Sequence, residues 1–277
     1  MTHENQLKRI EQFHELHESG CFILPNPWNP GSALYLQHLG FKALATTSAG
    51  FALTRGLTDA GMTLEIMLAH VRDIASATSL PVNADFQNGY VDEPHAVANS
   101  VSLCVQTGVA GLSIEDSTGK ADAPLYEFDL GVERIQAARQ AINKSGLPVV
   151  LTARCEAWLV KHPDARKIAL ERLVAYADAG ADCLYAPGVR DIDYISDIVK
   201  AVSPKPVNVL VSSSGPDLNF RQLEDVGVRR LSVGSALARV AWSAFMRAAK
   251  EINEEGTFES LDDIAMSMEL NKLFSST

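Results

Sequence analysis

The chain has few cysteines and no cluster of positive charge, and these two features limit the classes of protein to which it can belong. Its 277 residues include four cysteines, with no CxxC pair and no metal-ligand spacing. We therefore expect buried free thiols in a reducing cytosol. The net charge is −10 and the basic residues form no cluster, which argues against a nucleic-acid partner. An anionic substrate would have to be attracted by local positive groups.

Long apolar runs and the usual nucleophile motifs are missing as well. No apolar stretch reaches the roughly 20 residues that span a bilayer, and the polar, helical N-terminal segment is unlike a signal peptide. We expect a soluble, cytoplasmic protein without a membrane partner. None of the seven histidines ends a predicted strand, and there is no GxSxG elbow or P-loop. The chemistry left open is metal-assisted polarisation of an oxygen-rich substrate.

Eight short apolar runs recur along the chain, most of them rich in Val, Ile or Leu, as strands buried on both faces are. Helical patterns separate most of them. This alternation predicts an α/β fold, a single-domain (β/α)8 TIM barrel over residues 1–277. The predicted strands are Cys21–Asn26, Lys42–Ala49, Pro81–Phe86, Gly111–Asp116, Pro148–Arg154, Cys183–Gly188, Pro206–Val211 and Arg229–Gly234. The clearest predicted helices are Glu65–Thr78, Ala96–Thr107, Gly131–Asn143 and Ala165–Ala179.

Both ends of the chain add helix to the barrel. An N-terminal helix at about Asn5–Glu18 is expected to cover the N-terminal end of the barrel. After Gly234, a helical tail over residues 235–277 exceeds what the eighth barrel unit needs, with helices at Ala236–Glu254 and Leu261–Leu273. Its apolar residues, Trp242 among them, need burial either in a subunit interface or against the exterior of the barrel.

Polar residues that can carry chemistry stand where the predicted strands end, which is where barrel enzymes place their active sites. Asp85 ends strand three, Glu115 and Asp116 end strand four, and Arg154 ends strand five. Crowded carboxylates repel one another, and a hard cation such as Mg²⁺ relieves that repulsion. Alternatively, they cap helices or pair with an arginine. Arg154 would bind a substrate carboxylate or phosphonate, or form a structural ion pair with Glu115 or Glu156.

Two long loops also border the expected site. The loop after strand two holds Asp59, which could lie behind a metal ion or cap a helix, and Arg55, a candidate second anion clamp or a solvated charge. The loop from Ser117 to Phe128 mixes Gly, Pro and charge, as a mobile lid does. Lys120 in this loop could enter the site on closure, or it could be a surface lysine.

Taken together, these residues resemble the isocitrate lyase and phosphoenolpyruvate mutase superfamily, over nearly the whole chain from Asn26 to Gly234. The matching motifs are Thr47-Ser48-Ala49-Gly50, Gly56-Leu57-Thr58-Asp59, Asp85 with Gly89-Tyr90, Glu115-Asp116, Ala153-Arg154 and Gly227-Val228-Arg229-Arg230. The resemblance implies a barrel that binds Mg²⁺, with Mn²⁺ as an alternative, and a small anionic carboxylate substrate. It also implies a homo-oligomer, a dimer or a tetramer, with a C-terminal helix exchanged between subunits.

By this resemblance the site residues take definite roles. Asp59, Asp85 and Glu115 would surround the metal, mostly through waters. We assign the metal site itself to Asp85, Gln87 and Glu115, and catalysis to Lys120, Asp122 and Arg154, with a metal-bound water as an alternative proton carrier. The substrate would be bound by Ser48, Ala49, Gly50, Asp59 and Arg154.

The chain also departs from the family pattern. Gln87 stands where the family has a second metal-binding acid, and the lid lacks the Cys and His of the lyase branch. Pro187 replaces the strand-six His of the mutase branch, and Leu210 begins the segment that replaces the Asn-Thr/Ser-Glu cluster of the lyases. The first hypothesis is a Mg²⁺-dependent lyase or decarboxylase that acts through an enolate on a small 2-oxo or 2-hydroxy acid. The alternatives are a P–C bond enzyme, mutase or hydrolase, and a non-catalytic 2-oxo acid binding protein.

Overall fold

The computed structural model describes residues 2–214 and 218–275, and eight parallel strands form its centre. The hydrogen-bonded order is β1-β8-β7-β6-β5-β4-β3-β2. The Ala45 amide closes the remaining seam by donating to the Pro25 carbonyl at 3.0 Å. The strands are β1 Phe22–Leu24, β2 Leu44–Ala45, β3 Val82–Asp85, β4 Gly111–Glu115, β5 Val150–Arg154, β6 Cys183–Tyr185, β7 Val207–Leu210 and β8 Arg230–Ser232. The predicted TIM barrel is therefore confirmed.

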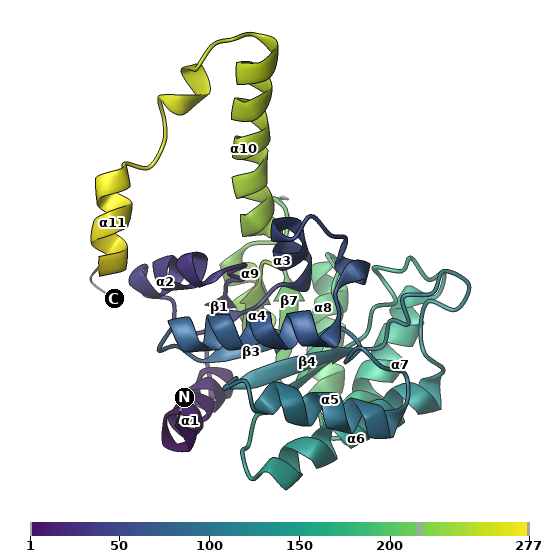
Figure 1. Ribbon diagram of the computed structural model, residues 1–277. Coiled ribbons are helices and arrows are strands. Elements are labelled where there is room, and N and C mark those ends of the chain that lie inside the picture. Colours follow the sequence, from purple (N-terminus) through teal and green to yellow (C-terminus); the bar gives the residue numbers. More distant parts are fainter. Residues whose placement is uncertain (1, 215–217, 276–277) are drawn as a thin grey trace.

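Helices surround this barrel (Figure 1). Several begin at residues that satisfy free backbone N–H groups, such as the Asn29 and Ser32 capping box of α2. The helices before β5 are α1 His3–Glu18, α2 Pro30–His38, α3 Ser48–Thr54, α4 Leu64–Ala77, α5 Pro94–Val105 and α6 Phe128–Ser145, with the 3₁₀ turn η1 Asp59–Gly61. Those after β5 are α7 Ala165–Asp178, α8 Ile192–Val202, α9 Phe220–Asp225, α10 Ala236–Glu254 and α11 Ser267–Ser275, with η2 Glu259–Leu261.

The prediction of one long second strand was wrong. Only Leu44–Ala45 is strand, and the chain turns into α3 at Ser48. The Thr47 hydroxyl starts this helix by accepting from the Gly50 amide at 3.1 Å. A side chain at Gly50 would lie 2.6 Å from Thr47 Cγ2 and 3.2 Å from Ala238 Cβ. The glycine thus lets α3 pack against the first turn of α10.

As predicted, the N-terminal helix α1 covers the N-terminal end of the barrel. Ile10 and Phe13 on α1 are fully buried. A Cβ atom on Gly111 of β4 would lie only 2.6 Å from the Phe13 ring, so the absence of a side chain admits that ring. Above it, the barrel interior is polar, with Asn83, Ser113, Thr152, Asn208 and Arg230 all buried. This polar column leads up to the C-terminal ends of the strands.

The C-terminal tail forms an arm that stands away from the barrel (Figure 1). α10 projects outward, and α11 returns to lie beside α2. At that contact a Cβ atom on Gly31 would lie 3.6 Å from the Phe274 ring. No helix within residues 2–214 and 218–275 combines the length and the apolar character needed to cross a membrane.

Candidate active site

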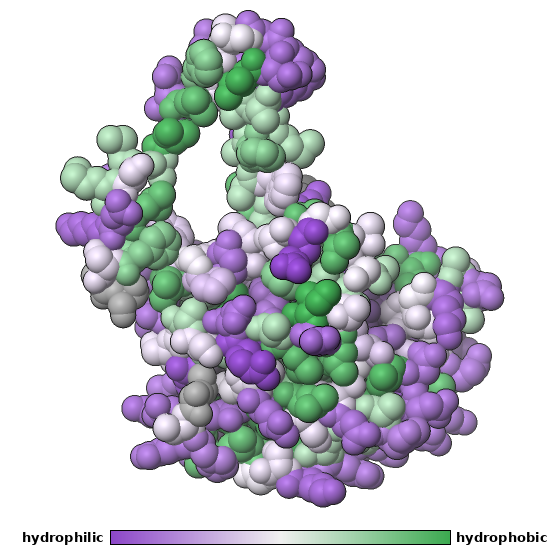
Figure 2. Space-filling model, in the orientation of Figure 1, coloured by the Kyte–Doolittle hydropathy of each residue, from purple (hydrophilic) through white to green (hydrophobic). Residues whose placement is uncertain are grey.

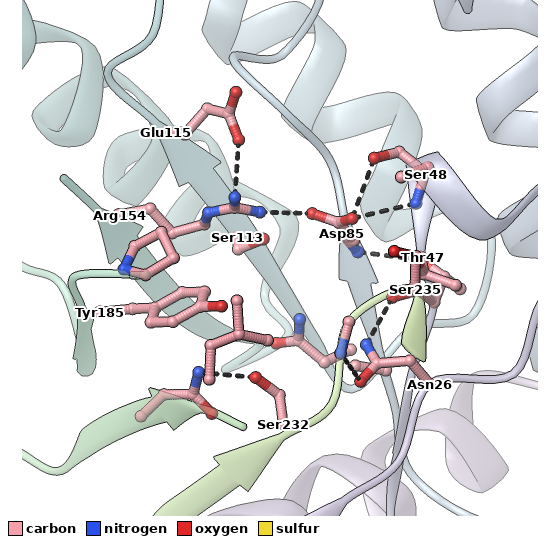
Figure 3. A pocket seen from close by; sticks show the side chains of 18 of the residues that line it. Asn26, Thr47, Ser48, Asp85, Ser113, Glu115, Arg154, Tyr185, Ser232 and Ser235 are labelled. Atoms are coloured by element: carbon pink, nitrogen blue, oxygen red, sulfur yellow. Dashed lines mark hydrogen bonds and ion pairs between the residues drawn. The ribbon is translucent and has the colours of Figure 1, made fainter. Parts of the chain in front are cut away.

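A cavity of about 250 Å³ opens at the C-terminal ends of the strands (Figure 3). Its volume suits a substrate of a few heavy atoms rather than a large cofactor. Asp85, Glu115 and Arg154 line it from β3, β4 and β5, and Tyr185 lines it from β6. The strand-end residues that the sequence singled out, apart from Asp116, thus share one volume.

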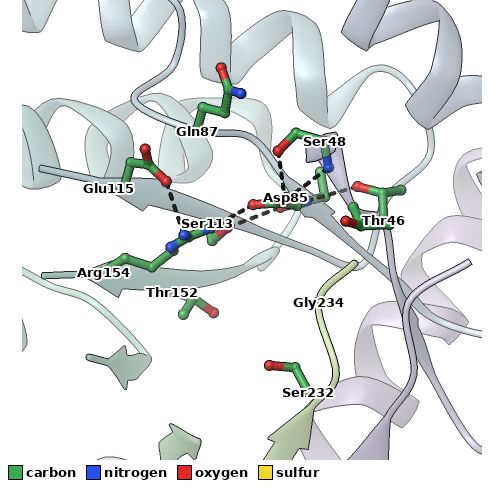
Figure 4. A network of polar contacts seen from close by, with 12 residues as sticks. Thr46, Ser48, Asp85, Gln87, Ser113, Glu115, Thr152, Arg154, Ser232 and Gly234 are labelled. Atoms are coloured by element: carbon green, nitrogen blue, oxygen red, sulfur yellow. Dashed lines mark hydrogen bonds and ion pairs between the residues drawn. The ribbon is translucent and has the colours of Figure 1, made fainter. Parts of the chain in front are cut away.

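The centre of the site is the guanidinium of Arg154, which is surrounded by three carboxylates. Figure 4 shows two of them, Asp85 and Glu115. Its Nη1 lies 2.6 Å from Asp85 Oδ1, and its Nη2 lies 3.1 Å from Glu115 Oε2 and 2.9 Å from Glu156 Oε1. Its Nε also donates to Glu156 Oε1 at 3.0 Å. Only 13% of the Arg154 side chain is exposed, so water screens these pairs weakly. The structure therefore contains the ion pairs with Glu115 and Glu156 that were the alternative prediction for Arg154.

Asp85 is held on its other side by the start of α3. Its Oδ2 accepts from both the backbone N–H and the hydroxyl of Ser48, each at 3.0 Å. Its own amide donates to the Thr46 hydroxyl at 2.9 Å. These contacts fix the carboxylate between β2 and β5, so its position does not depend on Arg154 alone.

Negative charge exceeds positive charge around this cluster. Burial, followed by repulsion from Asp85, raises the pKa of Asp59. Burial raises the pKa of Glu115 well above its usual value against the opposing effect of Arg154, and burial likewise raises the pKa of Glu156. Burial alone would lower the pKa of Arg154, but Glu156, Glu115 and Asp85 raise it well above normal. The site therefore holds more acid than one arginine neutralises.

The oxygen donors fit a hard divalent cation bound largely through water. Among the described residues no three acidic, His or Cys side chains form a complete cation-binding group. Mg²⁺, however, takes only one or two carboxylates directly and keeps several waters. Asp59 and Glu115 both line this cavity, and both line a neighbouring one that also includes Gln87. Gln87, in an unusual left-handed backbone conformation, donates to Asp59 Oδ1 at 2.7 Å.

The loop after β4 folds into a hairpin, and its first residues, Ser117, Thr118 and Gly119, line the neighbouring cavity. Ser117 and Leu125 form an antiparallel bridge, and the Thr118 hydroxyl donates to the Ala123 carbonyl at 2.5 Å. Lys120 Nζ lies 3.2 Å from Asp92 Oδ2, with its side chain 60% exposed. Asp122 is also exposed, and neither Lys120 nor Asp122 lines the cavity. In this conformation the two predicted lid residues are not brought to Arg154.

Asp116 points away from the cavity, contrary to its grouping with Glu115. Neighbouring residues of a strand face opposite sides, so Glu115 faces the barrel axis and Asp116 the surrounding helices. Asp116 Oδ2 accepts from Arg172 Nη1 at 3.0 Å and from the Tyr176 hydroxyl at 2.8 Å. Its Oδ1 accepts from the Glu156 amide at 2.8 Å. Asp116 thus ties the strand ends to α7 and positions Glu156.

Of the other residues predicted to bind the substrate, three line the cavity and one does not. Ser48, Ala49 and Asp59 line the cavity, whereas Gly50 does not and its N–H is already bonded to Thr47. For Gly50 the role in binding stays a prediction. The cavity is also lined by residues to which the sequence had suggested no role in the site: Thr46, Thr47, Ser113, Tyr185 and Ser232. For three of them the signal was the alternation along their strands, in the pairs Ser113/Glu115, Cys183/Tyr185 and Arg230/Ser232.

Comparison with known proteins places the chain in a family. Residues 13–253 match the family model described as phosphoenolpyruvate phosphomutase. An uncharacterised protein of Mycobacterium tuberculosis strain H37Rv is 33% identical over 249 residues, covering 87% of this chain and 89% of its own. The 2-methylisocitrate lyase of Escherichia coli K12 is 31% identical over 248 residues, covering 85% and 81%.

Solved structures agree over the whole chain. A protein of Burkholderia cenocepacia J2315, provisionally described as a lyase/mutase, is 45% identical with a TM-score of 0.94, covering 98% of each chain. Oxaloacetate acetylhydrolase in complex with its product oxalate is 25% identical with a TM-score of 0.86, covering 96% of this chain and 94% of its own. The chain therefore belongs to the phosphoenolpyruvate phosphomutase family, within the PEP mutase/isocitrate lyase superfamily.

Proposed function

We propose that the protein is a Mg²⁺-dependent carbon–carbon lyase or decarboxylase that acts on a small 2-oxo or 2-hydroxy acid through an enolate. The observation that carries the proposal is the cluster of Asp85, Glu115 and Glu156 around Arg154 in a cavity of about 250 Å³. This cluster can bind a cation and an anion side by side, as an enolate with its metal requires. Similarity to the 2-methylisocitrate lyase and to the oxaloacetate acetylhydrolase supports the same class of substrate.

Asp85 and Glu115 would hold the cation, with Asp59 and Gln87 behind them through water. Mg²⁺, or Mn²⁺, would supply positive charge next to the oxygen on which the enolate charge develops. Arg154 shares Asp85 and Glu115 with this cation, so their commitment to the metal would free Nη1 of Arg154 and the N–H of Nη2 that faces Glu115, while Nη2 stays paired with Glu156. These two groups would then bind the substrate carboxylate bidentately, while Glu156 keeps Nε in place.

In the proposed cleavage, one bond of the carbon next to the substrate carbonyl breaks. The electron pair passes to the carbonyl oxygen as an enolate, and the leaving fragment departs as CO₂, or as a carbonyl compound after its hydroxyl proton has passed to a base. A proton then adds to the carbon to give a 2-oxo acid or a carboxylic acid. Ser48 and Ala49 line the side of the cavity next to Asp85, where their donors would orient the substrate oxygens. Lys120 and Asp122 remain the proposed proton carriers, which requires movement of the hairpin after β4.

A turnover screen tests this proposal. The native protein would be incubated with 2-oxo and 2-hydroxy acids, including oxaloacetate and alkylated malates, in Mg²⁺ or in EDTA. The expected result is release of CO₂, pyruvate or glyoxylate with Mg²⁺ and not with EDTA, and loss of this release in Asp85→Ala. Phosphonopyruvate belongs in the same screen, because its turnover instead of the acids would indicate a P–C bond enzyme. No turnover together with ligand binding would favour the non-catalytic hypothesis.

We also propose that the arm packs against a second copy of the chain, which was one of two alternatives for the tail and the one that the family resemblance implied. Large apolar side chains stay uncovered on it, with Val240 67%, Phe245 61% and Met246 62% exposed. Figure 2 shows apolar residues along α10 and along the returning segment of the arm. Light scattering should give a dimer or a tetramer for the native chain and a smaller species for Phe245→Glu. A monomeric native chain would refute this assembly.

A further inference from the structure

The cavity has an acidic side and an apolar side. Its acidic side is formed by the ends of β3, β4 and β5, which carry Asp85, Glu115 and Arg154. In an eight-stranded barrel, β7 lies across the axis from β3, so the end of β7 faces Asp85. The residue there is Leu210, and the neighbouring loops after β5 and β6 contribute Leu159 and Pro187 to the lining. We call Leu159, Pro187 and Leu210 the apolar wall.

The backbone around the apolar wall holds its side chains in place. A Cβ atom on Gly234 would lie 3.1 Å from Leu210 Cδ1, and one on Gly188 would lie 3.2 Å from Leu159 Cδ2. The two glycines thus leave space that the leucines fill. Leu159 is nevertheless 49% exposed at the mouth of the cavity, so the apolar wall has a surface that a ligand could cover.

Among the described residues that line the cavity, none places a free cation at the apolar wall, and Arg190 on the loop after β6 is exposed and donates to the Ser213 hydroxyl instead of lining the cavity. Of the described residues that line the cavity, the cationic ones are Arg154 and Arg230. Arg154 belongs to the acidic side, and Arg230 is 2% exposed, bonded to Asn208 and Thr152 inside the barrel. A second substrate carboxylate placed against the apolar wall would lose water without gaining a partner. A hydrocarbon group there would gain by burial instead.

We infer that the apolar wall determines specificity: it takes an uncharged alkyl substituent, so that the carboxylate and oxygen groups of the preferred substrate that take part in the reaction lie at the acidic side. This rests on the proposed function, because it assumes that the head of the substrate binds at Asp85, Glu115 and Arg154. It excludes tricarboxylic acids and 2-oxo acids that carry a charged group beyond the bond that breaks. The apolar chain should contribute roughly fourfold in affinity for each methylene buried.

Competition against oxalate in Mg²⁺ tests the inference. Oxalate represents the oxygen-bearing head of the substrate and has no alkyl chain. Pyruvate, 2-oxobutyrate and 2-oxopentanoate carry an alkyl chain that grows by one carbon at each step. 2-Oxoglutarate has the length of 2-oxopentanoate but ends in a carboxylate. Affinities would be compared with that of oxalate for the native chain, for Leu210→Asn and Leu159→Asn, and for Leu103→Asn, a control at an exposed leucine of α5. Leu159→Arg adds a cation to the apolar wall.

In the native chain and in Leu103→Asn, affinity should rise along the alkyl series and 2-oxopentanoate should bind at least tenfold more tightly than 2-oxoglutarate. Leu210→Asn and Leu159→Asn should flatten the series, and Leu159→Arg should reverse the preference toward 2-oxoglutarate. Oxalate binding with a flat alkyl series, or with tighter binding of 2-oxoglutarate, would overturn the inference and leave the proposed function standing. Failure of oxalate to bind with Mg²⁺ would overturn both.

Discussion

Replacement of Arg154 by methionine should destabilise the fold strongly, because it leaves Asp59, Asp85, Glu115 and Glu156 crowded without their common cation. The guanidinium is 13% exposed, and its three carboxylate partners are between 6% and 19% exposed. Removal of one partner from a buried ion pair costs about 3–5 kcal/mol. In a protein of this size that loss lowers the melting temperature by about 6–20 °C.

The pH dependence of this loss follows from the raised pKa values of Asp59, Glu115 and Glu156. A carboxyl whose pKa is raised by folding favours the folded state while it is protonated, and that contribution is lost as the pH rises through the folded pKa. Without Arg154 these pKa values rise further. Arg154→Met should therefore cost more stability at about pH 8 than at about pH 5. Mg²⁺ should recover part of the loss, because it can replace the missing positive charge.

Differential scanning calorimetry at both pH values, with and without Mg²⁺, measures these effects. Arg166→Met is the matched control, since Arg166 pairs with Asp191 and Asp197 but its side chain is 56% exposed. Exposed pairs contribute little, so this variant should melt close to the native protein. The reasoning would be refuted if the two variants lost the same stability, or if the loss in Arg154→Met did not change with pH.

Three further predictions concern the surroundings of the site. Asp116→Asn should lower the free energy of unfolding by about 3 kcal/mol in urea denaturation, because Arg172 loses its buried partner, while oxalate affinity stays within a few fold. Gly50→Ala should cost about 1–3 kcal/mol in the same assay, since its methyl group would meet Thr47 and Ala238. Binding of Mg²⁺ should release protons, because the cation ionises carboxyls with raised pKa values; calorimetry in two buffers of different ionisation enthalpy measures the number, and no release would contradict those shifts.

The barrel could be predicted from the sequence because buried parallel strands read as short apolar runs between amphipathic helices. The second strand could not, since the turn into α3 depends on the Thr47 hydroxyl and on space for Gly50 beside Ala238, a residue far along the chain. The tail helices were predicted from composition, but their separation from the barrel as an arm depends on tertiary contacts that no local pattern encodes.

The candidate site was predicted in outline for a similar reason. Parallel strands bring their ends together, so Asp85, Glu115 and Arg154 could be grouped from position alone. Asp116 was misplaced because grouping by position ignores the alternation of faces along a strand. Lys120 pairs with Asp92 and does not line the cavity. This pairing depends on the conformation of a long hairpin, which sequence composition leaves undetermined.

The most direct test of the proposed function is a calorimetric titration of oxalate into the native chain, with Mg²⁺ and with EDTA, repeated on Asp85→Ala and on Gln87→Asp. The proposal predicts that oxalate binds the native chain only with Mg²⁺, that Asp85→Ala abolishes this binding, and that Gln87→Asp strengthens Mg²⁺ binding by restoring a second acidic group. Equal oxalate binding in EDTA, or binding that survives Asp85→Ala, would contradict a metal-dependent enolate site at Asp85, Glu115 and Arg154.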